Sequence, residues 1–156
     1  MKKILFIAAL FSTTLSQTSF AQNTTTQTSP TLYLYYNIKD ALVTGNAGLA
    51  ASKAEELKKA LSNAEQGSLS VANRNSLTKE ANLISSAKDI KAQRAAFTNL
   101  SATMLNIAKT EKLSMQPVYQ LYCPMKKSYW LSSEKAVKNP YYGSSMLTCG
   151  KVEGTL

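Results

Sequence analysis

Apolar residues recur at steps of three and four along much of the chain, which places them on one face of a helix. The first such segment begins just after Pro30, a start signal, and ends at Gly45, because glycine closes a helix in the left-handed conformation at low steric cost. A second helix is predicted over residues 47–66, with Gly67 as its stop. The apolar positions are Leu34, Tyr35, Ile38, Ala41 and Leu42 in the first segment and Ala50, Ala54, Leu57, Leu61 and Ala64 in the second.

Two further helices follow. Residues 68–75 are rich in turn formers, but Leu77, Ala81 and Ile84 then keep the helical step. Asp89 is expected to cap the fourth helix, because its carboxylate can accept hydrogen bonds from amides of the first turn. Short connections between amphipathic segments favour antiparallel neighbours, so the pattern predicts a mainly α protein, an up-down four-helix bundle. The apolar face of the fourth helix carries Ile90, Phe97, Leu100, Met104 and Ile107.

The pattern changes after Lys112. Residues 115–156 show no sustained helical period, yet they contain both cysteines, the only tryptophan and five of the eight tyrosines. Residues 118–122 have the character of a short strand, and residues 139–143 (Asn-Pro-Tyr-Tyr-Gly) form a turn signal. Each aromatic ring typically buries about 150–250 Å². We therefore expect an irregular C-terminal cap that carries Cys and Met, with room for a short β hairpin, packed on the bundle.

The N-terminal end has the features of a secretory signal peptide. Two lysines precede an apolar run at residues 4–10, and small residues end at Ala21, which predicts a signal peptide over residues 1–21. The run is shorter than the roughly 20 residues that span a bilayer. Residues 22–30 carry no charge and predict a flexible leader. Residues 31–156 suffice for one helical domain. Because of the signal peptide and the short apolar run, we expect a periplasmic or secreted protein without membrane insertion after signal cleavage.

The net charge of +9 falls to +7 once Lys2 and Lys3 leave with the signal. The remaining lysines are scattered among polar residues and are not interleaved with aromatic ones, so no nucleic-acid partner is expected. Arg94 is interpreted as a structural residue that could pair with Asp89 or Asp40. A cysteine nucleophile generally needs a base such as histidine, and the chain has no histidine. We therefore expect no enzymatic activity.

The cysteine and methionine side chains are the most distinctive candidates for a functional site. Cys123-Pro124-Met125 and, further on, Met146-Leu147-Thr148-Cys149 each combine a thiol with a thioether. Soft sulfur ligands select copper(I) over harder ions, whereas zinc would recruit histidine or more cysteine. The candidate metal ligands are Cys123, Met125, Met146 and Cys149.

A disulfide between Cys123 and Cys149 is the alternative, because two cysteines in an exported chain usually form one bridge. The cysteines are 26 positions apart. A bridge over such a loop would stabilise the fold by roughly 3.5 kcal/mol on the chain-entropy model. For Met125 and Met146, core filling is the common alternative role.

Several motifs resemble the DUF3347 family. The resemblance implies a helical exported domain of unknown function, found alone or fused to periplasmic adaptor subunits of heavy-metal efflux systems. Cys-Pro-Met is also similar to short heavy-metal binding segments that have a histidine nearby, whereas lysines follow it here. The resembling motifs are Lys-Asp-Ala-Leu-Val at 39–43, Asp-Ile at 89–90, Gln-Arg at 93–94, Phe97, Leu-Ser at 100–101, Tyr-Cys-Pro-Met at 122–125, Trp-Leu-Ser at 130–132, Lys-Asn-Pro-Tyr-Tyr-Gly at 138–143 and Met-Leu-Thr-Cys-Gly at 146–150.

Two hypotheses about function remain open. The first is a periplasmic accessory protein that binds copper(I) or a similar soft ion, linked to envelope metal-efflux components. The second is a disulfide-locked structural or interaction module of the cell envelope with no metal. The metal-binding state and the disulfide-bonded state can also alternate with redox conditions.

Overall fold

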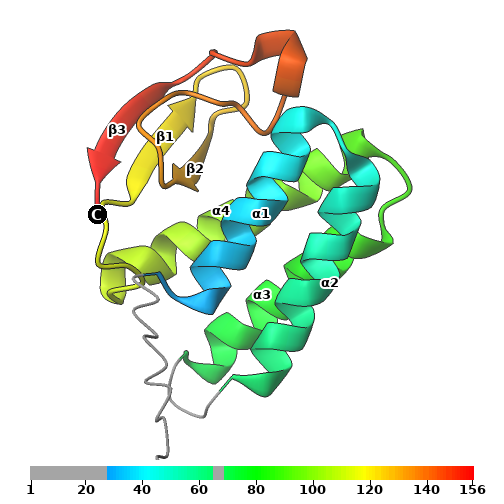
Figure 1. The fold of residues 1–156 in the computed structure, drawn as a ribbon, viewed down its shortest axis with the longest axis vertical. Coiled ribbons are helices and arrows are strands. Elements are labelled where there is room, and N and C mark those ends of the chain that lie inside the picture. Colours follow the sequence, from blue (N-terminus) through cyan, green and yellow to red (C-terminus); the bar gives the residue numbers. More distant parts are fainter. Residues whose placement is uncertain (1–27, 65–68) are drawn as a thin grey trace, which may run out of the picture.

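The computed structural model describes residues 28–64 and 69–156, and Figure 1 shows a group of helices with a small sheet at one side. The prediction of a mainly helical protein with four helices is confirmed. The predicted signal peptide, residues 22–27 of the leader and Gly67 lie outside the described residues. The elements are α1 (Pro30–Thr44), α2 (Ala47–Asn63), α3 (Val71–Ser86), α4 (Ile90–Thr110), β1 (Tyr119–Cys123), β2 (Ser128–Ser132), the 3₁₀ helix η1 (Gly143–Met146) and β3 (Lys151–Thr155).

Local capping explains where the helices begin and end. Asp89 caps α4 as predicted, since its carboxylate accepts from the main-chain nitrogen of Ala92 at 2.8 Å. Gly45 closes α1 with a φ of 73°. The turn formers of residues 68–75 do not delay α3, because the Ser70 hydroxyl accepts from the nitrogen of Asn73 at 3.1 Å and starts the helix there.

The described residues begin within the predicted leader. Thr28 forms an isolated antiparallel bridge with Ser114, and the nitrogen of Ser29 donates to the oxygen of Leu113 at 2.7 Å. Ser29 also caps α1, in which Pro30 occupies the first turn. Residues 28–30 therefore belong to the fold, because their hydrogen-bonding groups find partners in the segment that follows α4.

The predicted apolar faces form the core of the bundle. Each helix packs mainly against the next one in sequence. Periodicity identified these faces because apolar side chains at steps of three and four share one side of a helix. The up-and-down order of the bundle stays a prediction. Among the completely buried side chains are Leu32, Ile38 and Leu42 of α1, Leu57 and Leu61 of α2, Leu77 and Ile84 of α3, and Phe97, Leu100 and Met104 of α4.

The cap is more regular than the sequence predicted. It contains an antiparallel sheet with the strand order β2-β1-β3, so the expected short strand and hairpin exist and a third strand joins them. In the centre of the sheet, Leu121 pairs with Trp130 on one side and with Val152 on the other. The prediction of an irregular cap was wrong in this respect, because antiparallel pairing with β1 orders residues that carry little strand pattern of their own.

The sheet lies on the side of the bundle formed by α1 and α4, away from α2 and α3 (Figure 1). One buried hydroxyl joins three elements there. The oxygen of Tyr35 on α1 lies 2.7 Å from the hydroxyl oxygen of Ser101 on α4 and accepts from the nitrogen of Leu131 on β2 at 2.9 Å. Trp130 is completely buried beside Tyr141. The cap is therefore fixed to the bundle by a shared polar contact and by aromatic packing.

Candidate functional site

Strand pairing brings the two cysteines together. Cys123 ends β1 and is completely buried, whereas Cys149 lies just before β3 and is half-buried. Because β1 and β3 run antiparallel and Tyr122 pairs with Lys151, the residue after Tyr122 meets the segment before Lys151. Two residues that are 26 positions apart thus become neighbours.

The two cysteine side chains influence each other. Both are free thiols in the structure, and no bond joins them. Burial raises the pKa of the Cys149 thiol, and the nearby charge of Cys123 and a hydrogen bond to its side chain raise that pKa further. Folding therefore gathers a pair of thiols and holds Cys149 in the protonated form to a higher pH than in an unfolded chain.

The Cys123 sulfur sits among hydrogen-bond donors. It accepts from the main-chain nitrogen of Lys126 at 3.4 Å and from the side-chain nitrogen of Asn139 at 3.2 Å. The same nitrogen of Asn139 donates to the main-chain oxygen of Cys149 at 2.6 Å. The buried Cys123 sulfur therefore has two hydrogen-bond donors within the site.

Asn139 is the functional residue that the sequence reasoning missed. It is completely buried, and its side-chain oxygen accepts from the nitrogen of Tyr141 at 2.9 Å. Its main chain adds two bonds, to the oxygen of Leu147 at 2.8 Å and from the nitrogen of Gly143 at 2.9 Å. The Asn-Pro-Tyr-Tyr-Gly turn therefore places an amide against the cysteines. The sequence signal was an asparagine before proline, whose side chain often bonds its own backbone two residues on.

The two candidate methionines lie at the surface. Met125, in the turn between β1 and β2, is 62% exposed, and Met146, at the end of η1, is 40% exposed. The main-chain oxygen of Met146 accepts from the nitrogen of Cys149 at 3.1 Å, so these two residues share one turn. Core filling does not explain either methionine, in contrast to Met104, which is completely buried. The structure thus brings the two thiols together and leaves both thioethers on solvent-facing turns.

Close packing beside Cys149 requires glycine at position 150. Gly150 has a φ of 153°, and a Cβ atom there would lie 2.7 Å from the Trp130 ring and 2.9 Å from the oxygen of Tyr122. No real Cβ approaches other atoms this closely, so a side chain would push β3 away from β1. The glycine therefore maintains the approach of the two cysteine segments.

Arg94 has a structural contact, but with a different partner from the two that the sequence suggested. Neither expected partner pairs with it: Asp89 caps α4, and Asp40 forms an ion pair with Lys39 at 2.8 Å. Arg94 instead donates to the main-chain oxygen of Leu42 at 2.8 Å, near the end of α1. Carbonyl groups at a helix C-terminus lack partners within the helix, which makes them good acceptors for a cation.

In the part of the chain that the structure describes, no helix is both long and apolar enough to cross a membrane. No group of three or more His, Cys, Asp or Glu side chains gathers within residues 28–64 and 69–156.

Comparison with known proteins places the chain in a family. No curated protein and no solved structure matches it. One family model does match, over residues 31–116, which contain all of α1 except Pro30, the helices α2 to α4 and the beginning of the connection to β1. The match ends before Cys123, so the cap with its sulfur groups lies beyond it. Because the match covers more than half of the sequence, the chain belongs to the family described as protein of unknown function (DUF3347).

Proposed function

We propose that the protein is an exported accessory protein that binds copper(I) or a similar soft ion through Cys123 and Cys149. The observation that carries this proposal is the pairing of β1 with β3, which makes the segments of the two cysteines neighbours. The influence of Cys123 on the pKa of Cys149 agrees with this placement. Soft, polarisable sulfur ligands bind a soft monovalent ion well, and two thiolates on opposite sides of one ion suffice to hold it. The amide of Asn139 presents a hydrogen-bond donor to the Cys123 sulfur within the proposed site.

Burial of the thiols controls access and proton release. Cys149 is half-buried, which gives an incoming ion a route to a site whose other ligand is completely buried. Both thiols must lose their protons on binding, so copper(I) uptake releases protons and strengthens as the pH rises. The raised pKa of Cys149 adds to the pH dependence, because more free energy is needed to form its thiolate.

Met125 and Met146 are the proposed additional ligands. Met125 follows Cys123 by two positions, and Met146 shares a turn with Cys149. Both side chains are exposed, so their approach to the ion requires rotation of solvent-facing groups rather than rearrangement of the core. Exposed thioethers also suit transfer of the ion to a partner, since a weak ligand is easily exchanged.

The cellular setting belongs to the same proposal. A signal peptide over residues 1–21 would deliver the protein to the periplasm or the exterior, and envelope metal-efflux components would be its partners. The up-down bundle would serve as the scaffold for the cap, and we propose a binding function without catalysis. The absence of histidine from the chain supports a sulfur-only site.

A disulfide-locked interaction module is the second candidate function. It is favoured by the same placement of the two cysteines, since two neighbouring thiols in an oxidising compartment are the substrates of disulfide formation. In this case the bridge would join the end of β1 to the segment before β3, and the cap would present its aromatic side chains to another envelope protein. Counting free thiols in protein taken directly from the compartment separates the two functions.

Anaerobic competition between reduced protein and a copper(I) chelator tests the metal proposal. We expect one copper(I) per chain in the wild type and none in a Cys123→Ser/Cys149→Ser double variant whose circular dichroism spectrum shows that it is folded. Met125→Leu and Met146→Leu should weaken binding by a few-fold each.

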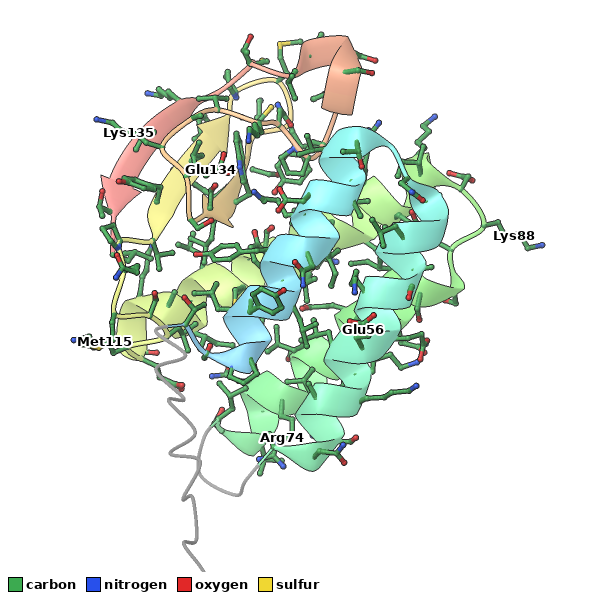
Figure 2. All side chains as sticks on the ribbon, in the orientation of Figure 1. Glu56, Arg74, Lys88, Met115, Glu134 and Lys135 are labelled. Carbon is green, nitrogen blue, oxygen red and sulfur yellow. The ribbon has the colours of Figure 1, made fainter. Side chains whose placement is uncertain are left out.

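Met115→Leu is the matched control for the methionine variants. Met115 is 68% exposed and lies beyond the end of α4, at the edge of the molecule in Figure 2. Its substitution should leave the affinity unchanged. Equal copper(I) binding by the wild type and the folded double variant would show that the thiols are not the ligands.

A further inference from the structure

A surface pocket lies between the bundle and the cap, and Lys126, whose main-chain nitrogen donates to the Cys123 sulfur, lines it. It has a volume of about 460 Å³ and is lined from α4 by Lys91, Arg94 and Ala95. The cap lines the pocket with Lys126 of the β1–β2 turn and with residues before and within η1, which are Tyr141, Tyr142 and Ser145.

The charges around this pocket are all positive. Three cationic side chains line it and no carboxylate does. Within residues 28–64 and 69–156, the salt bridges of the protein involve other lysines and leave Lys91, Arg94 and Lys126 without an acidic partner. Unpaired cations around a concave surface with protein walls concentrate positive potential, which attracts anions.

Arg94 has hydrogen-bonding capacity to spare. One of its terminal nitrogens donates to the oxygen of Leu42, but the buried Nε has no hydrogen-bond partner among the described residues. Burial also lowers the pKa of Arg94. A buried donor without an acceptor costs free energy, and an oxyanion placed beside the guanidinium would supply the missing acceptor.

The backbone at Gly143 leaves space for the Arg94 guanidinium beside the pocket. Gly143 has a φ of 59°, and a Cβ atom on it would lie 2.2 Å from Nη2 of Arg94 and 2.9 Å from the oxygen of Val43. Glycine is therefore required where the start of η1 crosses the guanidinium. Two aromatic side chains line the pocket beside it, the buried Tyr141 and the half-buried Tyr142.

We propose that this pocket binds a small organic phosphate, with its oxyanion between Lys91, Arg94 and Lys126 and its apolar part against Tyr142. A volume of about 460 Å³ exceeds what a bare phosphate ion fills, which is why the ligand has an organic part. Arginine suits the oxyanion because its planar group can donate two parallel hydrogen bonds. The proposed binding needs no redox chemistry.

Nuclear magnetic resonance titration of the mature protein with phenyl phosphate tests the proposal. We expect shifts of the backbone amides of Ala95, Lys126, Tyr142 and Ser145, and weaker binding as salt is added. Inorganic phosphate should bind more weakly because it lacks the ring, and phenol because it lacks the charge. Phenol binding as tightly as phenyl phosphate, or shifts confined to other surfaces, would overturn the proposal.

Charge variants make the test specific. A Lys91→Gln/Lys126→Gln variant should bind phenyl phosphate roughly tenfold more weakly, because each such ion contact contributes a few-fold. Lys135→Gln removes one positive charge from the outer side of the cap, where Figure 2 shows Lys135 pointing into solvent, and should have no effect. Equal affinity in the double variant and the control variant would contradict the assignment.

Phospholipid headgroups also carry a phosphate group, so a second experiment distinguishes a small organic phosphate from a lipid headgroup as the ligand. In co-sedimentation with vesicles that contain phosphatidylglycerol, the wild type and the Lys91→Gln/Lys126→Gln variant should behave alike. The opposite result would be a wild type that binds vesicles but not phenyl phosphate, together with a double variant that no longer binds vesicles. It would show that the pocket recognises a membrane surface instead of a small molecule.

Discussion

The side-chain amide of Asn139 donates a hydrogen bond to the Cys123 sulfur across 3.2 Å. The same nitrogen reaches the main-chain oxygen of Cys149, so one buried amide connects the two segments that carry the thiols. The proposed metal site therefore depends on a polar residue that would never bind the metal itself. Its contribution is to hold the two segments together and to present a hydrogen-bond donor to the Cys123 sulfur.

Asn139→Ala should destabilise the protein by about 2–4 kcal/mol, because it leaves several buried polar groups without partners. Chemical denaturation monitored by tryptophan fluorescence measures this directly, since Trp130 is the only tryptophan. Asn99→Ala, at an exposed position on α4, is the matched control and should change the free energy of unfolding by less than about 0.5 kcal/mol. A similar small effect at both positions would show that the amide is not a structural centre.

Replacing Cys123 by serine should make the Cys149 thiol more acidic. The wild-type pKa of Cys149 is raised by burial and, in addition, by the charge and the hydrogen bond of Cys123. Serine at position 123 cannot carry the charge of a thiolate, so alkylation of Cys149 should reach its half-maximal rate at a lower pH. The pH profile of alkylation by iodoacetamide under reducing-agent-free, anaerobic conditions checks this. An unchanged profile would mean that the two side chains do not interact.

Gly143→Ala should destabilise the fold by about 2–4 kcal/mol, since the new methyl group meets a backbone oxygen and the residue must keep a left-handed conformation. The clash is severe, because the Cβ would lie 2.2 Å from Arg94 Nη2 and 2.9 Å from the oxygen of Val43. Gly154→Ala is the control, because a Cβ there meets nothing within 4 Å. Thermal unfolding of both variants measures the difference. Equal melting temperatures would contradict the described approach of η1 to Arg94.

Stability should depend on pH through Glu80. Burial raises the pKa of this carboxyl above its model-compound value of 4.5, although a hydrogen bond from Thr103 opposes the shift. The folded state therefore binds more protons than the unfolded state between these two pKa values, and the free energy of unfolding falls as the pH rises through that window. Glu80→Gln cannot ionise and should flatten this dependence. Denaturation curves from pH 4 to pH 7 test it, and an unchanged slope in the variant would contradict the assignment to Glu80.

The helices could be predicted from the sequence because their information is local. Steps of three and four place Phe97, Leu100 and Met104 on one face, and a single carboxylate at Asp89 starts the helix. By contrast, β3 carries little signal, since Val152 is its only large apolar residue and its burial alternates between exposed and intermediate. Its existence depends on pairing with β1, which no local pattern of residues 151–155 encodes.

The candidate site could be predicted only in part for the same reason. The types and spacing of Cys123 and Cys149 indicated that the two residues would meet, because both the metal and the disulfide hypotheses require it. The position of Asn139 could not be inferred, since a turn-forming asparagine is normally exposed and only the packing of the cap buries it. Likewise, the pairing of Arg94 with the end of α1 depends on how α4 and η1 are placed.

X-ray absorption at the copper edge tests the central claim most directly. Protein loaded with one equivalent of copper(I) should show a first coordination shell made of sulfur alone, with two thiolates and a further thioether contribution that decreases in Met125→Leu and Met146→Leu. The Cys123→Ser/Cys149→Ser variant should lose this sulfur shell. A shell of nitrogen or oxygen in the wild type, or a sulfur shell that persists in the double variant, would contradict the account.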